Sequence, residues 1–265
     1  MTMIRLAING AAGRMGQRLV VLGSGEPDLR IVAALEAAGN PAVGRDAGEV
    51  AGIGALGVKI ETEWHVPADV MIDFSTPAGT LSRLADAVER RCAAVIGTTG
   101  LTAEQRGRLA DASRAIPILH APNMSVAVNL MFKIVGEVAA ALGVDYDVEI
   151  VEVHHRYKRD APSGTALRLA ESIAGATGRD AVRDAVFGRH GDVGERGPRE
   201  IGIHAVRGGD VVGEHTVSFM ALGERLEITH RAHTRDTFAR GALRAARFIA
   251  GKPPGLYTMQ DVLGG

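Results

Sequence analysis

The chain has 265 residues, of which 46% are hydrophobic and 4% aromatic, and its formal net charge is −1. This length suits one large α/β domain or two smaller ones, and the balanced charge argues against binding to nucleic acid or to a membrane surface. Cys92 is the single cysteine, which excludes an intrachain disulfide framework and a cysteine-based metal site. No apolar run is expected to approach the roughly 20 residues of a membrane span, and no signal-peptide layout is seen, so we expect a soluble, cytoplasmic protein.

The first half of the chain alternates short apolar runs with amphipathic stretches. The apolar runs predict strands at residues 4–9, 31–35, 70–74, 93–97 and 116–120. Helices are predicted between them, at residues 14–22, 80–91 and 102–114. Strands and helices that alternate at this spacing predict a doubly wound parallel sheet, the arrangement of Rossmann-like α/β domains.

The pattern changes after Asn123. Ser125 is predicted to cap an apolar helix that runs to about residue 142. A strand at 147–155 and a helix at 165–177 come next. Three longer strands, at 201–206, 214–222 and 224–231, are joined by short glycine-containing turns, so adjacent strands among them are expected to pair antiparallel. This half is predicted to be an α+β domain with a mixed or antiparallel sheet.

Residues 178–200 are rich in Gly, Arg and Asp and are predicted to form a long loop. A last helix at 237–250 is expected to return to the first domain. We therefore expect a dinucleotide-binding domain made of residues 1–125 and 235–265, with a second domain made of residues 126–234.

The first predicted strand is followed at once by a glycine-rich turn, Gly-Ala-Ala-Gly-Arg-Met-Gly. It is close to the dinucleotide fingerprint G-x-G-x-x-G, with Ala12 at the second glycine position. Small residues let the backbone approach a pyrophosphate, whose charge the helix dipole favours. The residues expected to contact the cofactor here are Gly10, Ala11, Ala12, Gly13, Arg14, Met15 and Gly16. The alternative is a tight strand–helix turn with no ligand.

Three further segments support a nucleotide site. Glu36 ends the second strand, 20 positions after Gly16, where an acidic residue binds the adenosine ribose. Two turns then follow later strands, at the sheet edge where doubly wound sheets bind ligands. Their expected contact residues are Gly97, Thr98 and Thr99 in one turn, and Pro122, Asn123, Met124 and Ser125 in the other. No G-x-x-x-x-G-K-[ST] motif occurs, so a P-loop hydrolase is not supported.

The segment from Glu152 to Thr165 carries the richest chemistry of the chain. It holds His154, His155 and Lys158, and then a Pro-Ser-Gly-Thr turn that enters a helix. Histidine and lysine can both donate protons near neutral pH once their surroundings shift them, and a helix N-terminus offers free N–H groups to an anion. The segment therefore predicts an acid catalyst beside a carboxylate-binding pocket.

Lys158 is unusual because only four of the 30 Lys+Arg residues are lysines. Arginine cannot release its proton under physiological conditions, whereas an ammonium can. His154 and Lys158 would each lower the pKa of the other and bring the pair toward working pH. Because adjacent strand residues face opposite sides, His154 and His155 are expected to have different roles, and a shared metal is not expected. The alternative is that Lys158 is a solvated loop residue.

Taken together, these residues resemble the 4-hydroxy-tetrahydrodipicolinate reductase (dihydrodipicolinate reductase) family over the whole chain. The most specific elements are Glu-Val-His-His at 152–155, Lys-Arg-Asp-Ala-Pro-Ser-Gly-Thr at 158–165, Gly-Arg-Met-Gly at 13–16, Gly-Thr-Thr-Gly at 97–100 and Gly-Glu-His-Thr at 213–216. The resemblance implies a cytoplasmic, NAD(P)H-dependent reductase of lysine and diaminopimelate biosynthesis. It also implies a homotetramer formed through the second domain.

The resemblance also implies residue roles. His154 matches the family's general acid, Lys158 its other proton donor, and His155 a substrate-binding histidine. Gly164 and Thr165 match a pair that holds a substrate carboxylate, and from the residues themselves Ser163 belongs to the same helix start. Arg235 matches a family arginine near the cleft between cofactor and substrate. A cyclic dicarboxylate needs two anion anchors, which Lys158 and this helix start would supply.

The chain departs from the family pattern at two positions, and one of these departures bears on the choice of cofactor. Ala37 stands where many members have an arginine for the 2′-phosphate of NADPH. Glu36 without that cation favours NADH, although Arg14 could compensate and leave both cofactors usable. Met124 stands where an aromatic residue is frequent. Two alternatives remain open, a related two-domain amino or imino acid dehydrogenase and an inactive nicotinamide-binding sensor, and intact His154 and Lys158 argue against the second.

Overall fold

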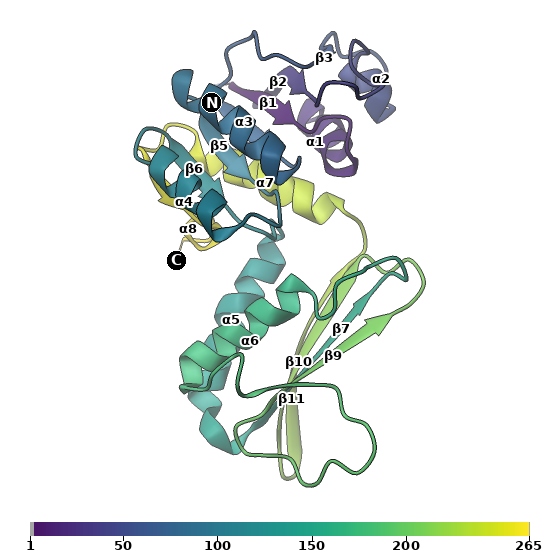
Figure 1. Cartoon of the computed structure of the whole chain (residues 1–265), viewed down its shortest axis with the longest axis vertical. Helices are drawn as coiled ribbons and strands as arrows, with labels where there is room; N and C mark the ends of the chain where they lie inside the picture. Colours follow the sequence, from purple (N-terminus) through teal and green to yellow (C-terminus); the bar gives the residue numbers. More distant parts are fainter. Residues whose placement is uncertain (1–2, 265) are drawn as a thin grey trace. The chain divides into compact units, whose positions relative to one another are not determined.

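The computed structural model describes residues 3–264, and the chain divides into two compact units. The first unit contains the residues up to Val126 and those from Arg235 onward, and the second contains Ala127–Thr234. The outer limits of the expected first domain, residues 1 and 265, lie outside the described residues. Figure 1 shows the chain passing into the second unit through α5 (Val126–Leu142) and returning in α7 (Asp236–Ile249).

The first unit is built on a seven-stranded sheet whose pairings are all parallel. In sheet order its strands are β12 (Gly255–Tyr257), β6 (Pro117–His120), β5 (Ala93–Ile96), β4 (Val70–Asp73), β1 (Ile4–Asn9), β2 (Leu29–Leu35) and β3 (Ile60–Glu61). The order reverses between β1 and β4, which is the point where doubly wound sheets bind their ligands. The predicted doubly wound parallel sheet is therefore confirmed.

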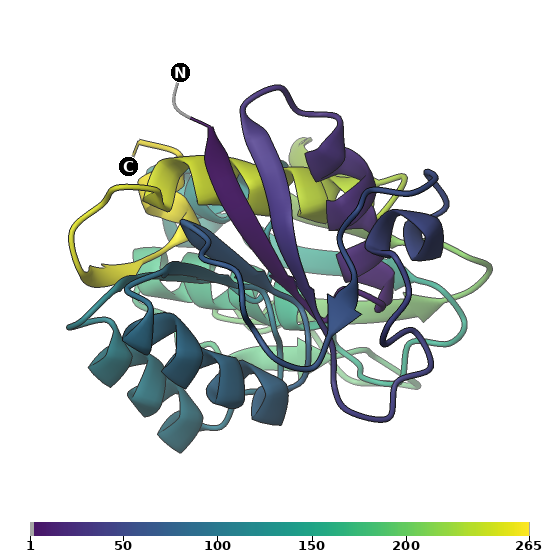
Figure 2. The same ribbon diagram turned by 90° about the horizontal axis from the view of Figure 1, so that it is seen from above.

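Helices cover both faces of this sheet. The helices α1 (Arg14–Ser24) and α7 pack with one apolar core, and α3 (Pro77–Glu89) and α4 (Ala103–Ala112) with another on the opposite face. Figure 2 shows α7, in yellow-green, beside the purple N-terminal segments. Arg18 of α1 pairs with Asp236 of α7 at 2.6 Å, a contact between residues 218 positions apart.

The second unit is built on a five-stranded mixed sheet with helices on one face. Its strands, in sheet order, are β11 (Glu224–Ala232), β10 (Gly213–Ala221), β7 (Asp147–His154), β9 (Ile201–Arg207) and β8 (Ala185–Phe187). The helices α5 and α6 (Gly164–Thr177) lie along the sheet in Figure 1 and share its apolar core. Along β7, Val148, Ile150, Glu152 and His154 face that core, because alternate residues of a strand point the same way. The predicted α+β second half with a mixed sheet is confirmed.

One strand pairing in this sheet was predicted wrongly. The strand β9 was expected to lie beside β10, but β7 lies between them, parallel to β9 and antiparallel to β10. The link from β9 to β10 wraps around the end of β7: Gly208 N donates to His154 O, and His155 N donates to Val211 O. A five-residue link is long enough to cross one strand, which short-turn reasoning did not allow for. The predicted antiparallel pairing of β10 with β11 is confirmed.

The shorter elements were largely missed by the sequence reasoning. The predicted loop 178–200 contains β8, which pairs parallel with β9. Two short helices were not predicted, α2 (Ala47–Ala51) and α8 (Met259–Val262). The short strands β3 and β12 were not predicted either. Elements this short carry too few residues for a hydrophobic period to stand out. The helix α3 begins at Pro77, earlier than expected, because Thr76 caps it by accepting from Gly79 N.

We expected no segment with the length and the apolar composition of a membrane span, and this expectation is wrong. Val126–Asp145 has 20 residues and a mean hydropathy of 1.6, enough to cross a membrane by those two criteria. In this fold it is α5 with the turn that follows, and one side of the helix packs in the core of the second unit. The buried side chains on that side are Val128, Met131, Phe132, Val135 and Ala139.

Candidate functional site

The first unit has a pocket of about 670 Å³ at the point where the sheet order reverses. It is lined by the ends of β1, β2 and β4 and by the first turns of α3. Its lining residues are Asn9, Gly10, Ala12, Gly13, Glu36, Ala37, Ala38, Asn40, Thr62, Phe74, Ser75, Thr76, Ala78, Gly79, Ser82 and Arg83. Four residues predicted to bind the cofactor therefore meet here: Gly10, Ala12, Gly13 and Glu36.

The backbone of the glycine turn fits a phosphate group. Gly10 has φ +79, and a Cβ on it would lie 2.7 Å from Phe74 O. A Cβ on Gly16 would lie 2.1 Å from Gly10 O, so α1 can pack against the turn only because this residue is glycine. Gly13 precedes α1 and brings no side chain to its first N–H groups. A helix start of this kind offers its N–H groups to an anion.

Glu36 also lines this pocket. Its Oε2 accepts from Ala12 N at 3.1 Å and its Oε1 accepts from Ala37 N at 2.9 Å, which ties the acid to the glycine turn. Arg83 of α3 lines the same pocket and pairs with Asp86 at 2.6 Å. Sequence reasoning did not place Arg83 at this pocket, because nothing in a helical stretch marks which of its cations lines a pocket.

A buried carboxylate ties the neighbouring strand ends together. Asp73, at the end of β4, accepts from Asn9 Nδ2 at 2.8 Å, and its other oxygen accepts from the hydroxyls of Thr80 and Thr98. Burial raises the pKa of Asp73, and these hydrogen bonds oppose that shift. The side chain of Thr98 is thus used in holding β4 and β5 together.

The other predicted cofactor residues vary widely in exposure. Ala11, Met124 and Ser125 are buried, with at most 2% of their surface exposed. Gly97 and Thr98 are also buried, and a Cβ on Gly97 would lie 2.4 Å from the Phe74 ring. Met15 and Asn123 are half-buried, and Gly16 is buried. Arg14, Thr99 and Pro122 are exposed.

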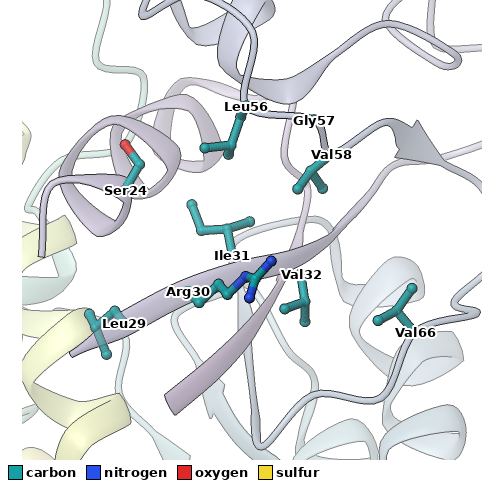
Figure 3. Close-up of a pocket in the computed structure, with 9 residues that line it drawn as sticks. All are labelled: Ser24, Leu29, Arg30, Ile31, Val32, Leu56, Gly57, Val58 and Val66. Atoms are coloured by element: carbon teal, nitrogen blue, oxygen red, sulfur yellow. The ribbon is translucent and has the colours of Figure 1, made fainter. Parts of the chain in front are cut away.

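A second, smaller pocket of about 340 Å³ lies beside the first half of β2 (Figure 3). Aliphatic side chains from β2 and from residues 56–58 surround it, and Arg30 brings a charge to its lining. It contains none of the predicted site residues and lies at the opposite end of β2 from Glu36. Of these two pockets, the larger one is therefore the one that contains residues predicted to bind the cofactor.

In the second unit, His154 and Glu152 form a buried pair on the inner face of β7. His154 Nδ1 lies 2.5 Å from Glu152 Oε2, and Glu152 is fully buried. Arg207, at the end of β9, donates two hydrogen bonds to the same carboxylate, at 2.7 and 2.8 Å. Burial raises the pKa of Glu152, but its hydrogen bonds to Arg207, His154 and the Ser163 N–H bring it below the usual value.

The surroundings also lower the pKa of His154. Burial is the main cause, and the positive charges of Lys158 and Arg207 add to it, while Glu152 opposes it. The predicted influence of Lys158 on His154 is therefore present but is not the largest one. The side chain of Lys158 is one-fifth exposed and pairs with both carboxylate oxygens of Asp160 at 2.9 Å.

The start of α6 lies beside this pair. Ser163 caps the helix by accepting from Ala166 N at 3.2 Å, and its own N–H donates to Glu152 Oε1 at 2.9 Å. Its hydroxyl also lies 3.1 Å from His215 Nε2. Gly164 is exposed and Thr165 is half-buried at the first turn of α6, and the start of a helix favours a carboxylate.

His215 forms one wall of this site and was not assigned a role from the sequence. Its ring lies 5.2 Å from that of His154, edge to face, and burial lowers its pKa to about 3. His155 is half-buried, in the loop that follows β7, and its Nδ1 is buried without a hydrogen-bond partner among the described residues. Arg235 is half-buried and directly precedes α7 in the first unit.

Sequence reasoning thus found the histidines, the lysine and the helix start, but not the residues that hold them. Glu152, Arg207, His215 and Asp160 come from three strands and a loop. The sequence could have indicated that Glu152 and His154 lie side by side, because residues at positions i and i+2 of a strand point to the same face. No group of three or more His, Cys, Asp or Glu in residues 3–264 is placed to hold a metal ion.

A Rossmann-like unit with a dinucleotide pocket, joined to a unit with a histidine–lysine acid site, defines a nicotinamide-dependent oxidoreductase. The family models agree. Residues 4–124 match "Dihydrodipicolinate reductase, N-terminus" and residues 127–263 match "Dihydrodipicolinate reductase, C-terminus". The chain belongs to the dihydrodipicolinate reductase family.

The most similar relatives cover nearly the full length. The 4-hydroxy-tetrahydrodipicolinate reductases of Geobacter metallireducens and Syntrophotalea carbinolica are 53% and 52% identical over 265 residues, which is 99% of each chain. A dipicolinate-bound dihydrodipicolinate reductase from Paenisporosarcina sp. TG-14 has 27% identity and a TM-score of 0.76, covering 97% of this chain and 98% of its own. The predicted family and the predicted activity, reduction of 4-hydroxy-tetrahydrodipicolinate with NAD(P)H in lysine biosynthesis, are confirmed.

At lower sequence identity, a likeness to solved structures shows the fold alone. An amine dehydrogenase from Mycobacterium smegmatis has a TM-score of 0.60 at 13% identity, over 97% of this chain. The alternative of a different two-domain dehydrogenase is not supported, because both family models and the relatives described above belong to the reductase family.

Proposed function

We propose that His154 and Lys158 are the proton donors of this reductase and that the start of α6 binds its substrate. The reaction converts 4-hydroxy-tetrahydrodipicolinate, NAD(P)H and a proton into tetrahydrodipicolinate, NAD(P)⁺ and water. Hydride addition to a conjugated imine places electron density on the ring, and a nearby acid must neutralise it. The observation that carries the proposal is the gathering of His154, Lys158 and the α6 N-terminus at the end of β7.

The substrate is a cyclic dicarboxylate, so the proposed site needs two anion anchors. The N–H groups of Gly164 and Thr165 serve one carboxylate, and the Lys158 ammonium serves the other. Ser163 holds the helix start in place, and His155 and Arg235 are proposed as further substrate contacts. The relative from Paenisporosarcina is described as bound to dipicolinate, a planar ring with two carboxylates, which supports this assignment.

The first unit is proposed to bind the dinucleotide along Gly10–Gly16, Glu36, and the turns 97–99 and 122–125. When bound, the nicotinamide supplies the hydride. The fit is supported by the crowded glycines of the turn, where a Cβ on Gly10 or Gly16 would meet backbone atoms at under 3 Å. The second unit would then be the substrate-binding and tetramerisation domain.

NADH is proposed as the preferred cofactor. Glu36 would accept hydrogen bonds from the ribose diol of NADH, whereas it would repel the 2′-phosphate of NADPH. Ala37 brings no cation to that phosphate, and Arg83, which lines the same pocket, is already paired with Asp86. Arg14 is exposed, next to the glycine turn, and would give NADPH a partial anchor.

A homotetramer is proposed from the uncovered face of the second sheet. The helices α5 and α6 cover the face that carries Val148 and Ile150, so Val151 and Val206 stand on the other face. Their side chains are 36% and 46% exposed. Apolar residues in the middle of a sheet face favour burial against another copy. Cytoplasmic location is proposed with the biosynthetic role.

A coupled assay tests the function. Substrate is generated from pyruvate and aspartate semialdehyde by the synthase that precedes this step, each cofactor is added separately, and oxidation of the nicotinamide is followed by its absorbance. We expect turnover with both cofactors and a higher kcat/KM with NADH. Absence of turnover with either would contradict the proposed function, and a preference for NADPH would contradict only the role of Glu36 and Ala37.

A further inference from the structure

We propose that Glu152 is the positioning residue for His154: its buried carboxylate accepts the Nδ1 proton, so that Nε2 is the nitrogen that gives a proton to the substrate, and Arg207 anchors the carboxylate. This inference rests on the proposed role of His154 as a proton donor. It assigns a function to two residues, Glu152 and Arg207, for which the family resemblance implied no role.

The first support is that Glu152 has no acceptor site to spare. Its Oε1 accepts from Arg207 Nη2 at 2.8 Å and from Ser163 N at 2.9 Å. Its Oε2 accepts from Arg207 Nη1 at 2.7 Å and lies 2.5 Å from His154 Nδ1. A carboxylate has about four lone-pair sites, so all of them are used. Glu152 therefore acts on the histidine and does not touch the substrate.

The second support is the tautomer that this arrangement requires. An ionised carboxylate can only accept, so the nitrogen facing it must carry hydrogen. Neutral His154 then has its proton on Nδ1 and a free lone pair on Nε2. After His154 gives its Nε2 proton to the substrate ring, it is left in this neutral form, and a proton from water restores the imidazolium. Glu152 stays ionised throughout, and the one proton that His154 gives to the substrate is replaced by one proton from water.

The third support is that space is kept open on the Nε2 side. Gly213 of β10 lies next to it, and a Cβ there would be 3.0 Å from His154 Nε2. A larger residue at Gly213 would close this side of the ring. The ring of His215 packs edge to face against His154 from the same strand, and burial keeps its pKa at about 3, so it is neutral at working pH.

The charges around His154 oppose one another. From its own strand, Glu152 favours the imidazolium, while Arg207 from β9 and Lys158 from the next loop disfavour it. Asp160 pairs with Lys158, and its backbone oxygen accepts from Arg207 Nη2 at 2.7 Å. Glu152 is thus the anion in direct contact with the ring, and Arg207 links it to the loop that carries Lys158.

The same strand provides a matched control. Glu149 lies on the opposite face of β7 and is also held by arginines and a histidine: Arg189 at 2.9 Å, Arg196 at 3.1 Å and His204 at 2.6 Å. If carboxylates of this kind serve only to hold the sheet together, substitutions at Glu149 and Glu152 should have the same consequences. If Glu152 positions a catalytic histidine, only its substitution changes the chemistry.

The main experiment measures kcat against pH for Glu152→Gln. His154 must be protonated to act, so kcat falls as pH rises through its pKa. Removing the carboxylate charge lowers that pKa, so this limb should move to lower pH by about one unit or more, and kcat at pH 7 should fall about 100-fold. The KM for NADH should stay within about twofold, because the dinucleotide pocket lies in the other unit. Glu149→Gln should leave the pH profile unchanged.

A double-substitution cycle separates positioning from folding. If Glu152 acts through His154, adding Glu152→Gln to His154→Gln should cost no further activity. A full additional loss in the double variant would overturn the proposal. If His154→Gln alone keeps normal turnover, then the proposed role of His154 fails first, and the inference falls with it.

A measurement on the unmutated chain does not depend on any variant folding. The ¹⁵N chemical shifts of His154 should show Nδ1 protonated at every pH, with only Nε2 titrating. A neutral form that carries its proton on Nε2 would overturn the proposal, as would an unchanged pH profile for a folded Glu152→Gln variant. A neutral Nδ1–H form in the unmutated chain, lost in Glu152→Gln, would support it.

Discussion

At the scale of single residues, the site is organised by buried carboxylates. Asp73 holds the strand ends around the dinucleotide pocket, and Glu152 holds the histidine that is proposed to donate a proton. Each is fully buried, and each accepts several hydrogen bonds from neighbouring segments. A buried charge is tolerated only when it is satisfied in this way, so these residues fix the geometry of the polar groups around them.

The proposed proton donors can be tested by removing each in turn. We expect His154→Gln and Lys158→Met to lower kcat by about 10²- to 10⁴-fold, because each removes a proton donor. Binding of NADH, measured by fluorescence titration, should stay near normal. Arg159→Met is the matched control, because it removes an exposed cation next to Lys158 and should keep full turnover. Loss of NADH binding in either variant would move the residue out of the catalytic site.

The proposed cofactor preference depends on Glu36 and Ala37. Glu36→Ala should weaken the binding of NADH more than the binding of NADPH. The substitution removes the acceptor for the ribose hydroxyls of NADH, and it also removes the repulsion between the carboxylate and the 2′-phosphate of NADPH. Ala37→Arg should raise kcat/KM for NADPH relative to NADH, because it supplies a cation for the 2′-phosphate. Ala37→Met adds bulk without charge and is the control. Equal losses for both cofactors in Glu36→Ala would mean that the carboxylate does not reach the ribose.

At the scale of elements, the contact between the glycine turn and α1 depends on one position. In Gly16→Ala the new methyl group would lie 2.1 Å from Gly10 O, so the first turn of the helix must move away from the pocket. We expect NADH affinity to fall at least tenfold and thermal stability to decrease. Gly107→Ala, in α4, has nothing within 4 Å of the added Cβ and should gain up to about 1 kcal/mol of stability. Unchanged affinity in Gly16→Ala would contradict the role of the turn.

The proposed tetramer depends on the uncovered face of the second sheet. Charged substitutions at Val151 and Val206 should convert the tetramer into smaller species in size-exclusion chromatography with light scattering, because a buried unpaired charge opposes association. Val182→Glu is the control, since Val182 is 86% exposed in the segment before β8. A tetramer that persists in Val151→Glu would place the interface elsewhere.

At the scale of the whole molecule, buried histidines make stability depend on pH. The pKa of His215 is about 3 in the folded chain, against about 6.5 when unfolded. Below pH 6.5 the unfolded chain binds a proton that the folded chain does not, so stability is fully present above that pH and is lost as pH falls toward 3. His154 and His230, whose pKa values are also lowered mainly by burial, act in the same direction.

This dependence can be measured before the carboxylates titrate. The urea midpoint should fall between pH 7 and pH 5, and the fall should be smaller in His215→Gln. His65→Gln is the control, because the side chain of His65 is 62% exposed. A pH dependence in His215→Gln equal to that of the unmutated chain would contradict the assignment of the effect to His215.

The sequence by itself determined the class of fold and most of the reactive residues. Strand–helix alternation predicts the parallel sheet, because it follows from local periodicity, and the glycine turn and Glu36 meet in one pocket because both lie at strand ends. The His-His and Lys-to-Thr motifs marked His154, Lys158 and Ser163, because reactive side chains and helix caps are local features.

Only the tertiary structure decided what surrounds those residues. The position of β7 between β9 and β10 brings Arg207 and His215 to His154, although they are separated from it by about 50 residues or more of chain. Strand order depends on which apolar faces can be buried together and on how far a link can reach, and neither quantity is written in a local stretch of sequence. The motif identifies His154 from the sequence alone. Glu152, which contacts it, and Arg207, which holds Glu152, could be recognised as its partners only from the pairing of the strands.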